Sequence, residues 1–331
     1  MEAKINEIIQ SLEAQFNGDT EHDIEIIRSY IRTLEKSEES QAIVIALGRY
    51  SAEKFPDAEV VKNAKKIEEA FKTFHEKVQK AQECLKNKDF EGAATIFREI
   101  IAEVKPPKDE EKRYMAFSHP FEEMLTRAST PDDKRPIERI SVLPATLYYQ
   151  LGLALFELKN YDEAKVAFDD AIALNPVSVV PYFELIQIAK IQNDFAEVRR
   201  LLSKIHPYIY TRHHLARFYR EHAGLAMIEK NYELAIALVY ISIDYEDAPP
   251  ARAQLNALAK NRGVDLSKPK ADTIKERLKA ADIPVGPNAA VYELAIGIGN
   301  TLKKTSPMAA KMAYAIAYDL THYEPLLKEL Q

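Results

Sequence analysis

The sequence predicts an all-α fold in which helical hairpins stack side by side into a solenoid. Three observations lead to this prediction. The 331 residues include only 9 Gly, with 47% hydrophobic and 29% charged residues, a balance that favours amphipathic helices over β-sandwiches and Gly-rich nucleotide-binding folds. Apolar residues recur at the i, i+3, i+4, i+7 spacing of one helix face. Related segments also recur about 34 residues apart along the chain.

The clearest of these segments is Tyr148–Pro176, YYQLGLALFELKNYDEAKVAFDDAIALNP. Its first helix carries one apolar stripe, made of Tyr148, Leu151, Gly152 and Leu155. Gly152 and Ala164 are small, so two antiparallel helices can approach closely while Phe168 fills the space beside them. Asn160-Tyr161-Asp162 forms the turn between the helices. The segment therefore predicts a tightly packed helical hairpin.

This segment resembles the tetratricopeptide repeat, whose pattern of Trp, Leu-Gly, Tyr, Ala, Phe and Pro extends over 34 residues. Tyr148 takes the place of the Trp, and Leu155 takes that of the Tyr. The Leu-Gly pair, Ala164, Phe168 and Pro176 match the family pattern. The resemblance implies a right-handed superhelix in which the first helix of each hairpin lines a concave groove.

Four repeat units are expected within residues 74–250, near 74–107, 145–178, 179–212 and 216–249. The unit at 179–212 departs from the family because Ile186 and Val198 stand where Gly152 and Ala164 stand in the best unit. Three extra residues precede the unit at 216–249. Four units exceed the roughly three that such arrays need for stability.

The remaining segments are helical but match the repeat poorly. Residues 1–73 predict a helical cap or decayed repeats. Residues 251–331 predict a helical region that ends in a divergent repeat, with Ala309, Ala313 and Ile316 on one face. The order of segments such as YMAFSHPFEEML and FYREHAGLAMIEKNYELAIAL is similar to an uncharacterised family of bacterial tetratricopeptide proteins.

Residues 108–144 interrupt the array with four Pro and an apolar cluster. The cluster consists of Tyr114, Met115, Phe117, Phe121, Met124 and Leu125. A long insertion this apolar is expected to fold back onto the repeats, and a mobile lid is the alternative.

No catalytic motif is present, so we expect no enzyme activity and no cofactor. His206, His213, His214 and His222 lack the i, i+4 spacing of a metal pair, and we expect no metal site. The first residues, MEAKINEIIQ, do not form a secretory signal, and apolar runs of about 20 residues are absent. With a single Cys, these features predict a cytoplasmic protein.

The groove predicted by the resemblance carries a second apolar stripe in the best unit, and this stripe passes into basic residues in later units. We expect the groove residues to be Tyr149, Leu153, Phe156, Phe183, Gln187, Lys190, Arg217, Arg220 and Met227. Such a face suits a peptide that is partly apolar and acidic. Arg217 and Arg220 could instead pair with acidic residues of the chain itself.

These features predict a protein-interaction module whose groove binds a peptide or protein segment. One alternative is a scaffold whose groove is filled by its own insertion and termini, so that it works through another surface. An RNA- or anion-binding array is a weaker alternative, suggested by seven Lys or Arg against three acidic residues in 179–220. The chain as a whole has a net charge of -6, which disfavours nucleic acid as a partner.

Overall fold

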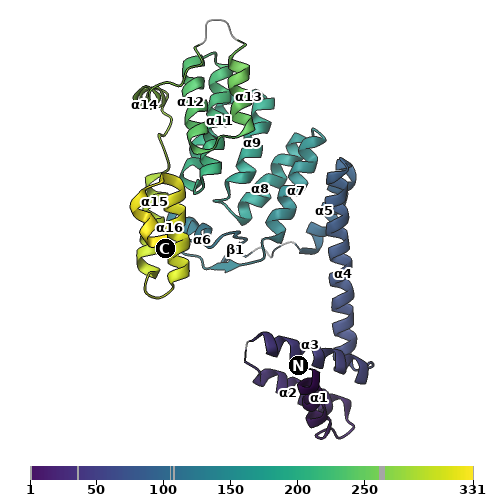
Figure 1. Cartoon of the computed structure of the whole chain (residues 1–331). Helices are drawn as coiled ribbons and strands as arrows, with labels where there is room; N and C mark the ends of the chain where they lie inside the picture. Colours follow the sequence, from purple (N-terminus) through teal and green to yellow (C-terminus); the bar gives the residue numbers. More distant parts are fainter. Residues whose placement is uncertain (1, 36, 105, 107–108, 261–264, 331) are drawn as a thin grey trace. The chain divides into compact units, whose positions relative to one another are not determined.

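The computed structural model describes residues 2–35, 37–104, 106, 109–260 and 265–330, and is almost entirely helical (Figure 1). The chain divides into two compact units, residues 1–80 and 81–331. Each is described by itself. The helix α4 (Glu59–Lys86) contains the boundary between the two units.

The first unit contains three helices before α4, namely α1 (Glu2–Glu13), α2 (Thr20–Thr33) and α3 (Glu38–Lys54). Its core is an aliphatic cluster of Leu12, Ile27, Ile43 and Leu47. Gly18 has φ +88° between α1 and α2, and the buried carboxylate of Asp23 accepts hydrogen bonds from the backbone N–H of Asn17 (2.9 Å) and Gly18 (3.2 Å). This local network fixes the turn. The cap or decayed-repeat origin of residues 1–73 stays a prediction.

The array consists of four helical hairpins (Figure 1). They are α4 with α5 (Phe90–Val104), α7 (Leu143–Glu157) with α8 (Tyr161–Leu174), α9 (Val179–Ile191) with α10 (Phe195–Ile205), and α11 (Arg212–Ile228) with α12 (Tyr232–Tyr245). Pro107, the last residue of the first predicted unit, lies outside the described residues. An all-α solenoid of helical repeats is therefore the fold of this array.

All four hairpins turn in the same way. The residue two before each second helix has a left-handed backbone, at Lys88, Lys159, Asn193 and Lys230, with φ between 57° and 61°. The next residue donates its N–H to the carbonyl five residues back, at 2.8–2.9 Å, in Asp89, Asn160, Asp194 and Asn231. This hydrogen bond satisfies a carbonyl at the end of the first helix, as in a Schellman motif. The four hairpins therefore share one turn geometry, as four repeats of one unit would; the division into four repeat units stays a prediction.

The three extra residues before the predicted unit at 216–249 lengthen a helix and do not form a loop. The helix α11 begins at Arg212 and has 17 residues, whereas α9 has 13. Thr211 caps α11 by accepting from the N–H of His214 at 3.3 Å. The fourth hairpin therefore begins earlier than the repeat pattern predicts.

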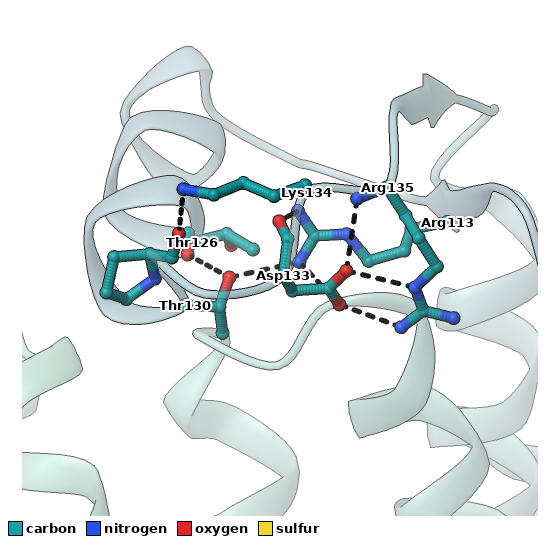
Figure 2. Close-up of polar contacts among 7 residues, drawn as sticks. Arg113, Thr126, Thr130, Asp133, Lys134 and Arg135 are labelled. Atoms are coloured by element: carbon teal, nitrogen blue, oxygen red, sulfur yellow. Dashed lines mark hydrogen bonds and ion pairs between the residues drawn. The ribbon is translucent and has the colours of Figure 1, made fainter.

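The insertion has regular structure of its own. Two short strands, β1 (Arg113–Met115) and β2 (Ile137–Arg139), pair in parallel with Arg113 opposite Ile137, so the described residues are not purely α-helical. The helix α6 (Pro120–Ser129) lies between them in the chain. Figure 2 shows how the connection after α6 is held. The Arg113 guanidinium donates to Thr130 Oγ1 at 3.0 Å and lies 3.4 Å from Asp133 Oδ2.

The insertion packs against the repeats, as the first of the two sequence interpretations expects. The carboxylate of Glu122, which is buried, joins α6 to the loops between hairpins. It accepts from Asn175 Nδ2 at 2.9 Å and from the hydroxyl of Tyr210 at 2.9 Å. The Ala116 N–H also donates to the Leu174 carbonyl at 2.8 Å. Three of the six apolar cluster residues, Met115, Phe121 and Leu125, are buried; Tyr114 and Phe117 are partly buried, and Met124 is exposed.

The C-terminal helices pack against α11 of the array and against α6 of the insertion. After α13 (Pro249–Leu258) and α14 (Ala271–Ala280), a turn at Gly286 contacts α11, where Gly286 N–H donates to the Tyr219 hydroxyl at 2.6 Å. The last hairpin, α15 (Ala289–Leu302) and α16 (Pro307–Thr321), lies beside α6 (Figure 1). The Arg212 N–H donates to Asp319 Oδ2 at 3.0 Å, which fastens the end of α16 to the start of α11.

Candidate interaction surface

The nine predicted groove residues lie on α7, α9 and α11, the first helices of three consecutive hairpins. We call the face of these helices that carries them the inner face. The left-handed turn residues give a common register for the three helices. In this register Tyr149, Phe183 and Arg220 are equivalent, and so are Phe156, Lys190 and Met227. The predicted residues therefore form rows across the repeats.

The α7 part of the inner face is aromatic and aliphatic. Tyr149, Leu153 and Phe156 are all partly exposed. The Tyr149 ring packs 5.9 Å from the ring of Phe168, and Phe156 packs edge-on against Tyr161 at 5.7 Å. Burial, helped by the nearby Glu184 carboxylate, raises the pKa of Tyr149, so its hydroxyl stays neutral. This end offers apolar contact area with one hydroxyl.

Phe183 does not present a binding surface, because its side chain is 0% exposed. The Arg217 guanidinium lies 4.4 Å from the centre of its ring, and His214 lies 6.1 Å away on the same ring. A cation over an aromatic face is attracted by the negative potential that the quadrupole of the ring creates there. Phe183 is therefore a support for Arg217, and the expectation that it contacts a partner directly is corrected.

A row of alternating charges crosses α9 and α11. Arg217 donates to Glu184 Oε1 at 3.1 Å and lies 3.6 Å from Glu221 Oε1. Glu221 also accepts from Gln187 Nε2 at 2.9 Å and pairs with Lys190. We call the four charged groups the charge ladder. The charges of its two cations and two carboxylates cancel, and the side chains are between 10% and 26% exposed.

Arg220 is a structural cation, with 7% exposure. It donates to Ser242 Oγ at 3.3 Å and lies 3.5 Å from Glu246 Oε2, both outside α11. Burial lowers the pKa of Arg220, and Glu246 opposes that shift. Arg220 is thus unavailable to a partner, which corrects the second expected contact. Met227, one of the other predicted residues, is partly exposed near the end of α11.

The sequence prediction missed Glu184 and Glu221, which hold the predicted cations. Two signals in the sequence could have found them. Glu221 follows Arg217 at the i, i+4 spacing of a helical ion pair. Glu184 and Glu221 also occupy equivalent places, each nine residues before its turn residue, Asn193 or Lys230.

The basic stretch 179–220 holds no unpartnered surplus of charge. Each of its seven cations has a partner within the chain, and several of these partners lie outside the stretch. Arg199 pairs with Glu229 and Arg200 with Glu197, while Lys204 lies 5.0 Å from the centre of the Tyr182 ring. Arg212 donates to the carbonyls of Asp244 and Tyr245. An anion-binding array is therefore not favoured.

Three histidines of this region lie in aromatic surroundings and add no positive charge: His206 is buried, and His214 and His222 are partly buried. Burial lowers the pKa of His214 to about 4 and that of His222 to about 3, with smaller contributions from nearby cations. The His222 ring packs 4.7 Å from that of Phe218, and His206 donates to the Gly286 carbonyl at 3.1 Å. Burial also lowers the pKa of His206. All three are neutral side chains of the core at pH 7.

Repeated hairpins with a shared turn and an inner face of partly exposed side chains define a helical-repeat protein of the kind used for protein interactions. The family model of the tetratricopeptide repeat matches residues 145–176. The chain therefore contains a tetratricopeptide repeat at residues 145–176, and this supports a protein-interaction module in general. No curated protein matches the chain. Within the part of the chain that the structure describes, no helix has the length and apolar character needed to cross a membrane.

Proposed function

We propose that the inner face binds a peptide segment of a partner protein and that the module acts without catalysis. The observation that carries this proposal is the charge ladder, which lies next to the apolar contact area of Tyr149, Leu153 and Phe156. Partly exposed polar groups set beside apolar area fix the register of a bound peptide. The repeat family supports the general role, and the arrangement of this face supports the peptide.

The charge ladder also narrows the chemistry of the peptide. Because Glu184 and Glu221 neutralise Lys190 and Arg217, an acidic peptide would have to compete with carboxylates already in place. Because these groups are mostly buried, a peptide carboxylate can replace one of them only if every charge of the ladder keeps a partner. We infer a peptide whose affinity comes chiefly from apolar side chains on α7, with a carboxylate or amide directed to Lys190 and Arg217.

A self-covered scaffold is the second candidate, and a specific observation favours it. The insertion and the last hairpin both pack on the edge where the hairpins connect, through Glu122 on one side and Asp319 on the other. The hollow lined by Ser118, Tyr149 and Pro181 measures only about 140 Å³. In this reading the inner face is mainly structural, and partners use another surface.

The test is a peptide selection followed by calorimetry. Peptides selected from a random displayed library against the full chain are measured with wild type, Leu153→Glu and Lys190→Glu. Val166→Glu on α8 is the matched control, because Val166 is 62% exposed on a second helix of the hairpins. We expect Leu153→Glu to weaken binding by about tenfold or more at any salt concentration. We expect Lys190→Glu to lose less, and its loss to shrink as salt is added.

The outcome that supports the scaffold is equally clear. If the selected peptides bind both inner-face variants as tightly as the Val166→Glu control, the inner face is not the binding site. Arg220→Glu and Phe183→Ala are unsuitable for this purpose, because both side chains are buried and their loss would disturb folding.

A further inference from the structure

An apolar cleft opens between α6 of the insertion and the last hairpin, away from the inner face. Its volume is about 130 Å³, and its lining is almost wholly apolar. The side chains that matter for the argument are Phe121, Met124, Ile298, Leu302, Met312 and Ile316. These come from α6 and from the two helices of the last hairpin, which lie far from α6 in the sequence, and α15 and α6 lie side by side in the fold (Figure 1).

Exposed methionines surround this cleft. Met124 is 42% exposed on the α6 side, and Met312 is 43% exposed on the α16 side. Met308 is 73% exposed and lies one helical turn before Met312. Methionine is flexible and polarisable, and it is common on surfaces that adapt to apolar helices. Apolar area in water costs roughly 25 cal/mol per Å², so this surface gains stability when it is covered.

The rim of the cleft carries more positive than negative charge. Arg139 lines the cleft, and it shares the single carboxylate of Glu123 with Arg127. Both guanidinium groups are at least half exposed. On the opposite side, Lys303 and Lys304 follow Leu302 directly, and Lys303 pairs with Glu329 at 2.5 Å.

Arg139, which lines the cleft, and the cations that neighbour its lining in the chain, Arg127, Lys303 and Lys304, have two carboxylate partners between them, in a chain with a net charge of -6. The excess of positive charge is local, and its sign is opposite to that of the net charge of the chain. A partner that bears acidic residues beside an apolar face would complement both properties of the cleft.

We propose that this cleft, the methionine cleft, docks an amphipathic helix of a partner protein with an apolar face and acidic flanks. The apolar residues of the helix enter between Met124 and Met312, and its acidic flanks meet Arg139 on one side and Lys303 and Lys304 on the other. The site is separate from the inner face and does not depend on the peptide proposed there. A module with both sites would hold two segments of partner chain at once.

The probe is a fluorescein-labelled synthetic helix of about 16 residues, long enough to be partly helical alone. It carries Leu at the i, i+3, i+4, i+7 positions of one face and Glu on the flanks, and a second peptide carries Lys in place of each Glu. Fluorescence anisotropy with the full chain should give a dissociation constant of about 1–100 μM for the acidic peptide. The basic peptide should bind at least about tenfold more weakly.

Variants locate the binding on the molecule. Met124→Asp with Met312→Asp should abolish binding of the acidic peptide. Val166→Asp, equally an Asp at an exposed apolar position, should leave it unchanged. Both altered methionines are exposed, so the helical content should be retained by circular dichroism.

Several results would overturn the proposal. Equal binding of the acidic and basic peptides would remove the electrostatic argument, and no binding of the acidic peptide would remove the site. Loss of binding in Leu153→Glu, with none in the methionine double variant, would assign the peptide to the inner face. Self-association in sedimentation velocity that disappears in Met312→Asp would show that a second copy of the chain covers the cleft.

Discussion

Two glycines of α15 allow the packing of the last hairpin to be tested within one helix. Gly297 and Gly299 have the same helical backbone, but their surroundings differ. A Cβ at Gly297 would meet no atom within 4 Å, whereas a Cβ at Gly299 would lie 2.5 Å from Cε1 of the Tyr314 ring. Ala at Gly297 and Ala at Gly299 should therefore have opposite effects on stability.

The magnitudes follow from two contributions. Replacing Gly with Ala inside a helix stabilises it by about 0.5–1 kcal/mol, and this applies to both positions. At Gly299 the contact of 2.5 Å is well below the 3.5–4.0 Å of ordinary carbon contacts, so the Tyr314 ring must move. That ring is buried, and its hydroxyl donates to Asn300 Oδ1 at 2.8 Å, so movement costs about 1–3 kcal/mol. We expect Gly297→Ala to be more stable than Gly299→Ala by about 1–3 kcal/mol.

Urea unfolding followed by circular dichroism at 222 nm measures this difference, because the chain has no Trp to report by fluorescence. Gly152→Ala should behave like Gly299→Ala, since its Cβ would lie 2.5 Å from Cε1 of the buried Phe168 ring. The two contacts would then show that the last hairpin packs as the best repeat does. A Gly299→Ala variant as stable as Gly297→Ala would refute the close-packing argument for the last hairpin.

Three further outcomes are expected from the core. Ala164→Leu should lower the free energy of unfolding by about 1–3 kcal/mol, because the site is fully buried, while Val166→Leu on the same helix should change it little in the same urea assay. Glu122→Gln should cost about 1–3 kcal/mol and speed tryptic cleavage within α6, since an amide cannot accept from all the donors now directed at this carboxylate. Burial depresses the pKa of His214 to about 4 and of His222 to about 3, so the unfolded chain takes up protons first as the pH falls below about 6.5. Stability should then fall by up to about 1.4 kcal/mol per pH unit for each, and His222→Gln should flatten that slope between pH 6.5 and 4.

The hairpins could be predicted from the sequence because their chemistry is local. Asn160 and Asn231 stand at the turns where second helices begin, and small residues such as Gly152 mark the close contacts. Gly299 likewise marks a close contact, with the ring of Tyr314. Turn residues and packing stripes act over a few residues of chain, so a single sequence carries them.

The partners of the candidate site could not be predicted as well, because they depend on neighbouring helices. The pairing of Arg217 with Glu184 crosses from α11 to α9, and that of Arg220 with Glu246 reaches beyond α12. The parallel pairing of β1 with β2 and the return of the last hairpin to α6 likewise join segments that no local pattern connects. Two signals were readable in advance: the i, i+4 spacing of Arg217 and Glu221, and the equivalence of Glu184 and Glu221 in the repeat register.

The same reasoning separates the two candidate surfaces by their charge. In the sequence, the stretch 179–220 has more cations than carboxylates. In the fold, Glu221, Glu229 and Glu246, which follow this stretch in the chain, pair with its cations. The inner face is consequently balanced, and its selectivity must come from apolar contact and hydrogen bonds. The methionine cleft keeps a surplus of positive charge after its ion pairs are counted, because Arg127 and Arg139 share the carboxylate of Glu123. The two proposals therefore predict long-range attraction of an acidic partner at the methionine cleft, and recognition by short-range contact at the inner face.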